Sequence, residues 1–314
     1  MSVLVYAESW NGNFRKSSFE TVSYASETAK ILGTDVIAVS LESVSDDELC
    51  KLGNYGAAKV VSVPNINKGD SQSAAKVFAD LSSDSSVIVF SNTYTAKMIA
   101  PRLSVKIGAA LLTNVISASE GSDIQVKRKS FSTKAIETAK SNTEKSILCI
   151  APNSFGLIET GGSCIIEKVD FLETGNLSFD GQETASGKIS ISEADIVVSG
   201  GRGLKGPENW GMIEELADVL GAATSCSKPV ADIGWRPHDE HVGQTGKSVT
   251  ADLYIAIGIS GAIQHLAGVN SSKVMVAINT DPEAPFFKAA DYGIVGDAFE
   301  VVPQFIEEIK KLKN

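Results

Sequence analysis

Short runs of β-branched residues alternate with helical stretches along the first third of this chain, and this feature constrains its fold most tightly. Helical stretches at Ser17–Leu32 and Ser71–Leu81 separate the runs in pairs. The runs are rich in Val and Ile and lie at Val3–Ala7, Asp35–Leu41, Lys59–Val63 and Val87–Ser91. Because βαβ units alternate in this way, the pattern predicts a mostly parallel sheet with helices on both faces.

The region that follows predicts an extension of this sheet and then a domain boundary. Runs at Ile124–Ser130, Ala135–Ala139 and Ser146–Ile150 leave little room for helices, which favours an antiparallel extension. The stretch Glu173–Lys188 is polar, contains several glycines and has no apolar period, as interdomain segments do. We therefore expect an N-terminal α/β domain over residues 1–185 and a second domain over residues 186–314.

Composition excludes several classes of function. The formal charge is −10 and no run of Lys and Arg is interleaved with aromatics, so nucleic acid is not an expected partner. The four cysteines form no CxxC pair and the three histidines have no ligand cluster beside them, so no metal is expected. No apolar stretch approaches the roughly 20 residues that span a bilayer, and the first residues resemble a strand more than a signal peptide. We expect a cytoplasmic protein that does not insert into membranes.

Each predicted strand of the second domain runs directly into a loop of Gly, Ser, Asn, Asp or Arg. The strands are Ala194–Val198, Ala222–Ser225, Leu253–Ile259, Lys273–Ile278 and Asp291–Val295. Ligands of open parallel sheets bind beyond the carboxyl ends of the strands. The pattern therefore predicts a doubly wound parallel sheet with one extended ligand lying across several loops.

The loop Ser199–Pro207 reads SGGRGLKGP and stands between a strand and a helix with apolar residues at helical spacing. Its glycines let the backbone approach an anion, and Arg202 can bind phosphate oxygens with two N–H groups. Pro207 and Glu208 suit the first turn of the helix. A glycine-rich turn with a structural role alone is the alternative.

Three later stretches carry further polar groups. Val242–Lys247 reads VGQTGK and lacks the spacing of a P-loop, so a tight polar turn is the alternative there. In GISGAIQHLAG, Ser260 can cap a helix whose early turns hold His265, and a lone helical histidine is often only a structural donor. Asn279 and Asp297 each stand just past a strand.

Together these stretches resemble the FAD domain of the α subunit of the electron transfer flavoproteins. That family shows SGGRG, a segment like GAAVGASRAAVDAGY, then VGQTGK, GISGAIQHLAG, AINxDPEAP and ADYGIVGD, in the order found here. The resemblance runs nearly continuously from Ile196 to Pro303. It is looser in the N-terminal domain, although the opening Val-Leu-Val-Tyr-Ala-Glu is similar.

The resemblance implies that the C-terminal domain holds one FAD. Arg202 would lie beside the flavin or its phosphates, and Ser227 would bind the diphosphate region or the ring edge. Asn279 and Asp297 would hold the adenosine half. The implied cofactor-binding residues are Arg202, Ser227, Lys228, Val242, Gly243, Gln244, Thr245, Ser260, Gly261, Ala262, Ile263, Gln264, His265, Asn279 and Asp297.

Three of these residues would tune the redox potential. The Thr245 hydroxyl would lie near flavin N5, and His265 would donate to the flavin C2 carbonyl. Lys228 stands where the family's ASRA segment has arginine, and Pro229 follows in place of alanine. Lysine keeps the charge but loses the planar group that can stack on a flavin. A Lys228 that points to solvent is the alternative.

The implied function is that of an electron carrier without a substrate of its own. Such a subunit pairs with a β subunit, itself the expected binder of AMP, and the N-terminal domain is expected to dock it. Electrons would come one at a time from flavin dehydrogenases such as acyl-CoA dehydrogenases and pass to a membrane quinone reductase. An electron-bifurcating relative that uses NADH stays open. So does a nucleotide-binding enzyme that uses NAD or ATP on the same fold, with His238 and His241 as its acid–base pair. The favoured interpretation of these two histidines is that they are loop residues near the ring face.

Overall fold

The computed structural model describes residues 1–121, 123–131, 134–172, 176–177 and 190–313. The chain forms two compact units, Met1–Glu183 and Thr184–Asn314. The predicted boundary between residues 185 and 186 lies outside the described residues, as does most of the predicted interdomain segment. Each unit is treated below by itself.

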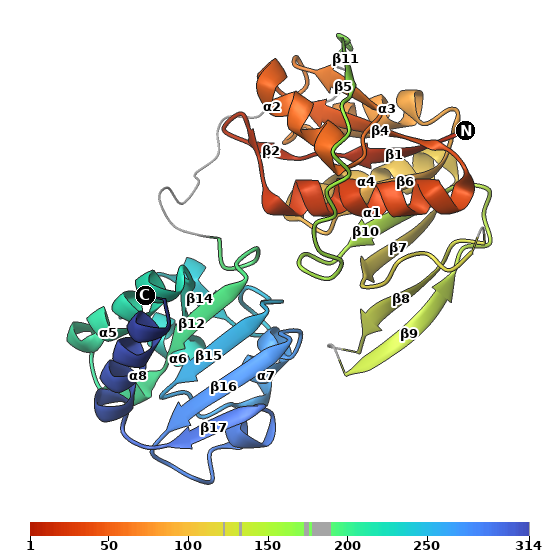
Figure 1. Ribbon diagram of the computed structural model, residues 1–314. Coiled ribbons are helices and arrows are strands. Elements are labelled where there is room, and N and C mark those ends of the chain that lie inside the picture. The colour runs from red at the N-terminus through yellow and green to blue at the C-terminus, as the bar shows by residue number, and fades with distance from the viewer. Residues whose placement is uncertain (122, 132–133, 173–175, 178–189, 314) are drawn as a thin grey trace. The chain divides into compact units, whose positions relative to one another are not determined.

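The N-terminal unit is built on a large, mostly parallel sheet (Figure 1). Among the described residues this sheet has nine strands in the order β11-β5-β4-β1-β6-β10-β7-β8-β9. The strands are β1 Ser2–Tyr6, β4 Asp35–Leu41, β5 Lys59–Val63, β6 Ser85–Ser91, β7 Ala110–Val115, β8 Gln125–Ser130, β9 Ala135–Lys140, β10 Ser146–Ile150 and β11 Ile165–Lys168. A short hairpin, β2 Ser9–Trp10 and β3 Asn13–Phe14, follows β1.

Helices cover both faces of this sheet. Helix α1, Lys16–Leu32, contributes Val22 and Tyr24 to the core on one face, which the short α2, Asp46–Cys50, also borders. Helices α3, Ser71–Leu81, and α4, Tyr94–Ile107, pack on the other face through buried residues such as Phe78 and Ile99. Both predicted helices are confirmed. Helix α4 was not predicted, although the Thr93 side chain accepts a hydrogen bond from the Ala96 N–H and caps it.

The predicted antiparallel extension is only partly right. Strands β8 and β9 pair antiparallel, as expected. Strand β10 is instead parallel and lies between β6 and β7, inside the sheet. All five of its residues are buried, and a strand inside a sheet covered on both faces has this character. Strand β11, which was not predicted, adds parallel to β5 at the far edge.

The C-terminal unit is a second parallel sheet whose strand order reverses in the middle. Among the described residues six strands lie in the order β14-β13-β12-β15-β16-β17. They are β12 Ile196–Gly200, β13 Ala223–Ser227, β14 His241–Val242, β15 Leu253–Ile257, β16 Val274–Asn279 and β17 Tyr292–Val295, all paired in parallel. After β12 the chain adds β13 and β14 on one side of it, and then adds β15, β16 and β17 on the other side. The carboxyl ends of the neighbouring strands β12 and β15 therefore mark the topological switch point, where doubly wound sheets bind ligands.

Helices cover both faces of this sheet as well, which confirms the doubly wound prediction. Helices α5, Gly211–Leu220, α6, Lys228–Asp232, and α8, Ala298–Lys313, pack on one face with core residues such as Ile213 and Val302. Helix α7, Ile263–Val269, and the extended segments near it border the other face, where Tyr254 and Phe286 are buried.

Candidate functional site

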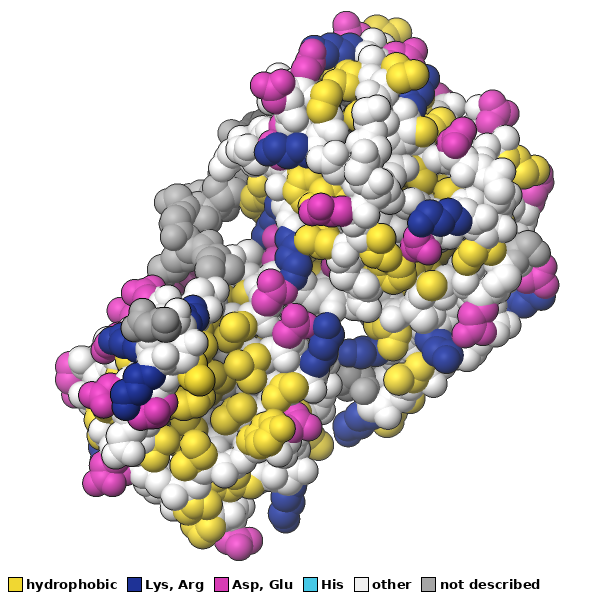
Figure 2. Space-filling view, in the orientation of Figure 1, with side chains coloured by type: hydrophobic (Ala, Val, Ile, Leu, Met, Phe, Trp, Pro, Cys, Tyr) yellow, Lys and Arg dark blue, Asp and Glu magenta, His cyan; other side chains and the backbone are white. Residues whose placement is uncertain are grey.

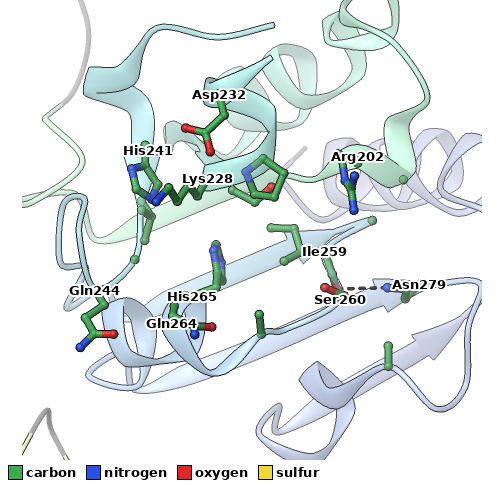
Figure 3. A pocket seen from close by; sticks show the side chains of 18 of the residues that line it. Arg202, Lys228, Asp232, His241, Gln244, Ile259, Ser260, Gln264, His265 and Asn279 are labelled. Carbon is green, nitrogen blue, oxygen red and sulfur yellow. Dashed lines mark hydrogen bonds between the residues drawn. The ribbon is translucent and has the colours of Figure 1, made fainter. Parts of the chain in front are cut away.

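A cavity of about 700 Å³ opens at the carboxyl ends of the strands of the C-terminal unit, at the switch point (Figure 3). This volume lies within the range of small-molecule and cofactor sites. The lining residues come from loops after five of the strands. They are Arg202, Gly203, Ser227, Lys228, Pro229, Asp232, Ile233, His241, Val242, Gly243, Gln244, Thr245, Gly258, Ile259, Ser260, Ala262, Gln264, His265, Asn279, Asp281 and Ala284.

The glycines after β12 and β15 let two loops meet at the floor of this cavity. A β-carbon built on Gly201 would lie 2.1 Å from the Gly258 carbonyl oxygen, and one on Gly203 would lie 2.6 Å from the Gly258 α-carbon. Gly258 itself has a positive φ of 63°, which disfavours other residues. The backbone bonds across this contact, from Gly201 N–H to Ile257 and from Gly203 N–H to Gly258, are 2.8 and 3.0 Å long. The glycines of SGGRG therefore have a structural role, because they let the loops after β12 and β15 pack backbone against backbone.

Most of the residues predicted from the sequence line this cavity. Two clusters lie apart in Figure 3: Lys228, Asp232 and His241 on one side, and Arg202 and Asn279 toward the other end. Ser227 is buried at the N-cap of α6 and its hydroxyl makes no capping hydrogen bond. The Asn279 side chain donates to the Ile259 carbonyl at 3.1 Å and accepts from the Asp281 N–H at 3.0 Å, so it also pins the ends of β15 and β16.

Three predicted residues are not among those that line the cavity. Gly261 has a positive φ of 84° and packs against the Phe286 backbone, while Ile263 is 62% exposed. Asp297 accepts from the Phe299 N–H at the start of α8 and pairs with Lys205 at 3.4 Å. Their proposed contacts to the cofactor remain predictions. The expectation that Ser260 caps a helix is wrong, since the N-cap residue of α7 is Ala262.

The sequence placed His238 and His241 either in an alternative enzyme or near the ring face, and the structure brings His241 into the cavity wall beside Lys228 (Figure 3). Burial lowers the pKa of His241, and the neighbouring Lys228 charge lowers it further. His238, its proposed partner, is exposed and does not line the cavity.

His265 is a deeply buried member of the predicted ring-contacting set, at 7% exposure. Its Nε2 lies 2.9 Å from the Tyr254 hydroxyl oxygen. Burial and then the nearby His241 lower its pKa to about 4, so the ring is neutral near pH 7. Its other nitrogen, Nδ1, is buried and makes no hydrogen bond of normal geometry within the described part of the chain. Tyr254 was not singled out from the sequence, because strand periodicity marks it only as a core residue.

Comparison with known proteins bears directly on this site. Residues 3–173 match the family model described as the electron transfer flavoprotein domain, and residues 190–270 match the electron transfer flavoprotein FAD-binding domain. The electron transfer flavoprotein subunit alpha of Bacillus subtilis (strain 168) is 40% identical over 326 residues, covering 99% of this chain and 98% of that one. The Paracoccus denitrificans subunit alpha is 38% identical, covering 97% and 98%, and the mitochondrial subunit alpha of Dictyostelium discoideum is 34% identical, covering 99% and 92%.

This chain belongs to the electron transfer flavoprotein alpha subunit family. The resemblance seen in the sequence is thereby confirmed, and the second unit is a flavoprotein's FAD-binding domain in an electron transport family. Among the described residues, no helix is both long and apolar enough to cross a membrane.

The alpha subunit's cavity fits such a cofactor on its own chemistry. Gly203 and Gly258 bring backbone without a side chain to the cavity lining, and two cations, Arg202 and Lys228, line its wall. Anionic phosphates and a ring that gains electrons are both stabilised by such charges. Nδ1 of His265 is buried and forms no hydrogen bond of normal geometry with any described residue, and a polar atom of this kind is one that a bound ligand satisfies.

Proposed function

We propose that this alpha subunit holds one FAD in the cavity at the switch point and carries electrons one at a time between proteins. The observation that carries the proposal is the convergence of Arg202, Lys228 and His265 on one cavity in a family FAD-binding domain. When bound, the flavin supplies the redox chemistry. The chain's residues bind it, shelter it and set the local charge.

Different parts of the cavity wall would bind different parts of the cofactor. The Gly201–Gly203 and Gly258–Ala262 loops suit the phosphates, because glycines without side chains let backbone N–H groups approach an anion and Arg202 lies in the first of these loops. On the opposite wall Lys228, Thr245 and His265 suit the ring, since a cation and fixed donors stabilise the negative charge that reduction adds. No lining group is placed as a nucleophile with its own base, which favours a carrier over an enzyme.

We further propose that the chain works as a heterodimer with a beta subunit that binds AMP. Apolar side chains at the β17 edge of the C-terminal sheet are left open, with Tyr292 66% and Val295 59% exposed. Figure 2 shows hydrophobic side chains gathered over this unit. Open apolar surface of this kind is typical of a protein interface. The donors would be flavin dehydrogenases such as acyl-CoA dehydrogenases, and the acceptor a membrane quinone reductase.

Purification with a candidate beta subunit tests this proposal. The complex is expected to be yellow, with one FAD per alpha chain and one AMP per heterodimer, and reduced acyl-CoA dehydrogenase should reduce it. The chain alone should lose FAD or aggregate, because its interface would be open. A colourless complex would contradict the proposal. Two FAD per heterodimer and direct reduction by NADH would instead identify the bifurcating alternative.

A further inference from the structure

Tyr254 on β15 is buried behind the cavity and contacts one of its lining residues. Its Oη lies 2.9 Å from Nε2 of His265, and Tyr254 and His265 are 0% and 7% exposed. The Phe286 ring stacks on Tyr254 at 6.3 Å and lies 6.0 Å from the His265 ring. This apolar packing keeps water from the pair, so the hydrogen bond has no competing solvent partner.

With Nε2 committed to Tyr254, Nδ1 is the ring nitrogen left for a ligand of the cavity. Burial keeps His265 neutral near pH 7, since its pKa is lowered to about 4. A neutral imidazole donates from one nitrogen and accepts at the other. The Val242 backbone lies close to the ring and slightly opposes the lowering of the His265 pKa. Nδ1 nevertheless forms no hydrogen bond of normal geometry with any described residue. Which nitrogen has the proton therefore decides whether His265 can donate to a ligand.

The chemistry of the two groups indicates which way the Tyr254 bond runs. A neutral imidazole has one nitrogen without a proton, and a tyrosine hydroxyl donates to such a nitrogen, so the Tyr254 proton is directed to Nε2 of His265. Ser199 on β12 and Ser225 on β13 are paired in register and face the same side of the sheet as Tyr254. Burial raises the pKa of Tyr254, and these two serine hydroxyls oppose that rise. Each serine hydroxyl is buried and forms no hydrogen bond of normal geometry in the described part of the chain, so each has a proton that it can donate toward Oη.

We propose that Tyr254 is a positioning residue that donates to Nε2 of His265 and fixes the ring in its Nδ1–H form. His265 then presents one N–H donor to the negative charge that the cofactor gains. This inference rests on the proposed function, because it concerns the FAD that the cavity holds. A donor fixed in advance stabilises that charge without reorganising. Without the Tyr254 hydroxyl the ring would exchange between both neutral forms.

Replacing Tyr254 by Phe tests the proposal, because Tyr254→Phe removes Oη and leaves the ring packed on Phe286. The matched control is Tyr24→Phe in the N-terminal unit. Tyr24 is also buried, but its hydroxyl makes no hydrogen bond with any described residue. Nitrogen-15 spectra of the full chain, labelled in its three histidines, report the tautomer of each ring from pH 5 to pH 8.

Without added FAD, His265 is expected to be mainly Nδ1–H in the parent and in Tyr24→Phe. In Tyr254→Phe the ratio of the two forms should change about fivefold or more, the factor that one neutral hydrogen bond supplies. The double variant Ser199→Ala with Ser225→Ala keeps the ring and should shift the ratio in the same direction. An Nε2–H ring in the parent, or an unchanged ratio in both variants, would overturn the proposal.

A second measurement on the same proteins separates this proposal from the proposed function. Loaded with FAD in complex with the beta subunit, Tyr254→Phe should keep its dissociation constant within about fivefold, because the lost hydrogen bond is a neutral one and the variant leaves the cavity wall in place. Its first one-electron potential should fall relative to the second, which Tyr24→Phe should not cause. If none of the proteins bound FAD even in complex with the beta subunit, the proposed function would be wrong and the spectra alone would decide the role of Tyr254.

Discussion

The guanidinium of Arg236 and the carboxylate of Glu240 form a two-point ion pair, with Nε and Nη2 each 2.7 Å from a carboxylate oxygen. Their side chains are only 16% and 6% exposed, and the guanidinium also lies 5.2 Å from the Trp210 ring centroid. Glu240 directly precedes His241, and His241 begins the continuous stretch of cavity-lining residues that runs to Thr245. The ion pair therefore holds the loop from which one side of the proposed FAD site begins.

Arg236→Lys should weaken this loop although it keeps the charge. Lysine cannot form both hydrogen bonds at once, so we expect a loss of about 1–2 kcal/mol in the free energy of unfolding of the C-terminal unit, with weaker FAD retention. Chemical denaturation and flavin release measure the two effects. Lys310→Met is the control, because the Lys310–Glu215 pair is 51% and 55% exposed and should contribute under about 0.5 kcal/mol. Equal losses in both variants would show that the two-point geometry is unimportant.

Gly201→Ala should damage the floor of the cavity. Its β-carbon would overlap the Gly258 carbonyl, which is backbone and cannot turn away, so we expect a loss of about 1–3 kcal/mol in stability together with lost flavin. The control is Gly211→Ala at the start of α5, where a β-carbon would meet nothing within 4 Å. That change should be neutral or slightly stabilising. Thermal melts and FAD titration compare them, and a Gly201→Ala protein as stable as the control would contradict the crowded floor.

Arg202→Ala should lower FAD affinity without unfolding the domain. Losing a charge-assisted contact to phosphate costs roughly 1.5–3 kcal/mol, or about ten- to hundredfold in the dissociation constant. Lys273→Ala removes a cation next to the amino end of β16, away from the lining residues, and should change affinity little. Flavin fluorescence titration measures both. Dissociation constants within twofold of the parent for Arg202→Ala would remove Arg202 from the site.

Lys228→Ala should lower the potential of the first electron step more than that of the second. The first electron adds negative charge without a compensating proton, so it gains most from a nearby cation. The same variant should raise the pKa of His241, which Lys228 holds down. Spectroelectrochemistry at low and high salt measures the potentials, and histidine NMR measures the pKa. Unchanged first-step potentials would show that Lys228 points to solvent, since an exposed charge gives only a small, salt-screened change.

The free energy of unfolding should fall as pH drops through the range set by His265. Its pKa is about 4 in the folded protein against an ordinary value of 6.5, so below pH 6.5 the unfolded chain binds the proton first. Stability is therefore complete above pH 6.5 and falls by up to about 3 kcal/mol toward pH 4. Denaturation of the chain without flavin at several pH values measures this slope. His265→Gln should flatten it, and an equal slope in that variant would assign the effect to other groups.

The sequence alone predicted the parts of this protein that depend on local pattern. Runs of β-branched residues predicted most strands of both units, because a strand buried on both faces needs a continuous apolar run. Glycine and polar loops after each strand of the C-terminal unit predicted the edge where Arg202, Lys228 and His265 gather. Parallel strands bring their carboxyl ends to one edge in any such fold, so this placement needs no knowledge of strand order.

Only the tertiary structure decided which distant segments meet. Strand β10 could be recognised as a strand, but its place between β6 and β7 depends on pairing with segments far along the chain. The contact between Tyr254 and His265 and the entry of His241 into the cavity wall arise in the same way. Each depends on which side chains face each other after the sheet closes. Periodicity along a chain encodes which face a residue takes, whereas the partner on that face is fixed by long-range packing.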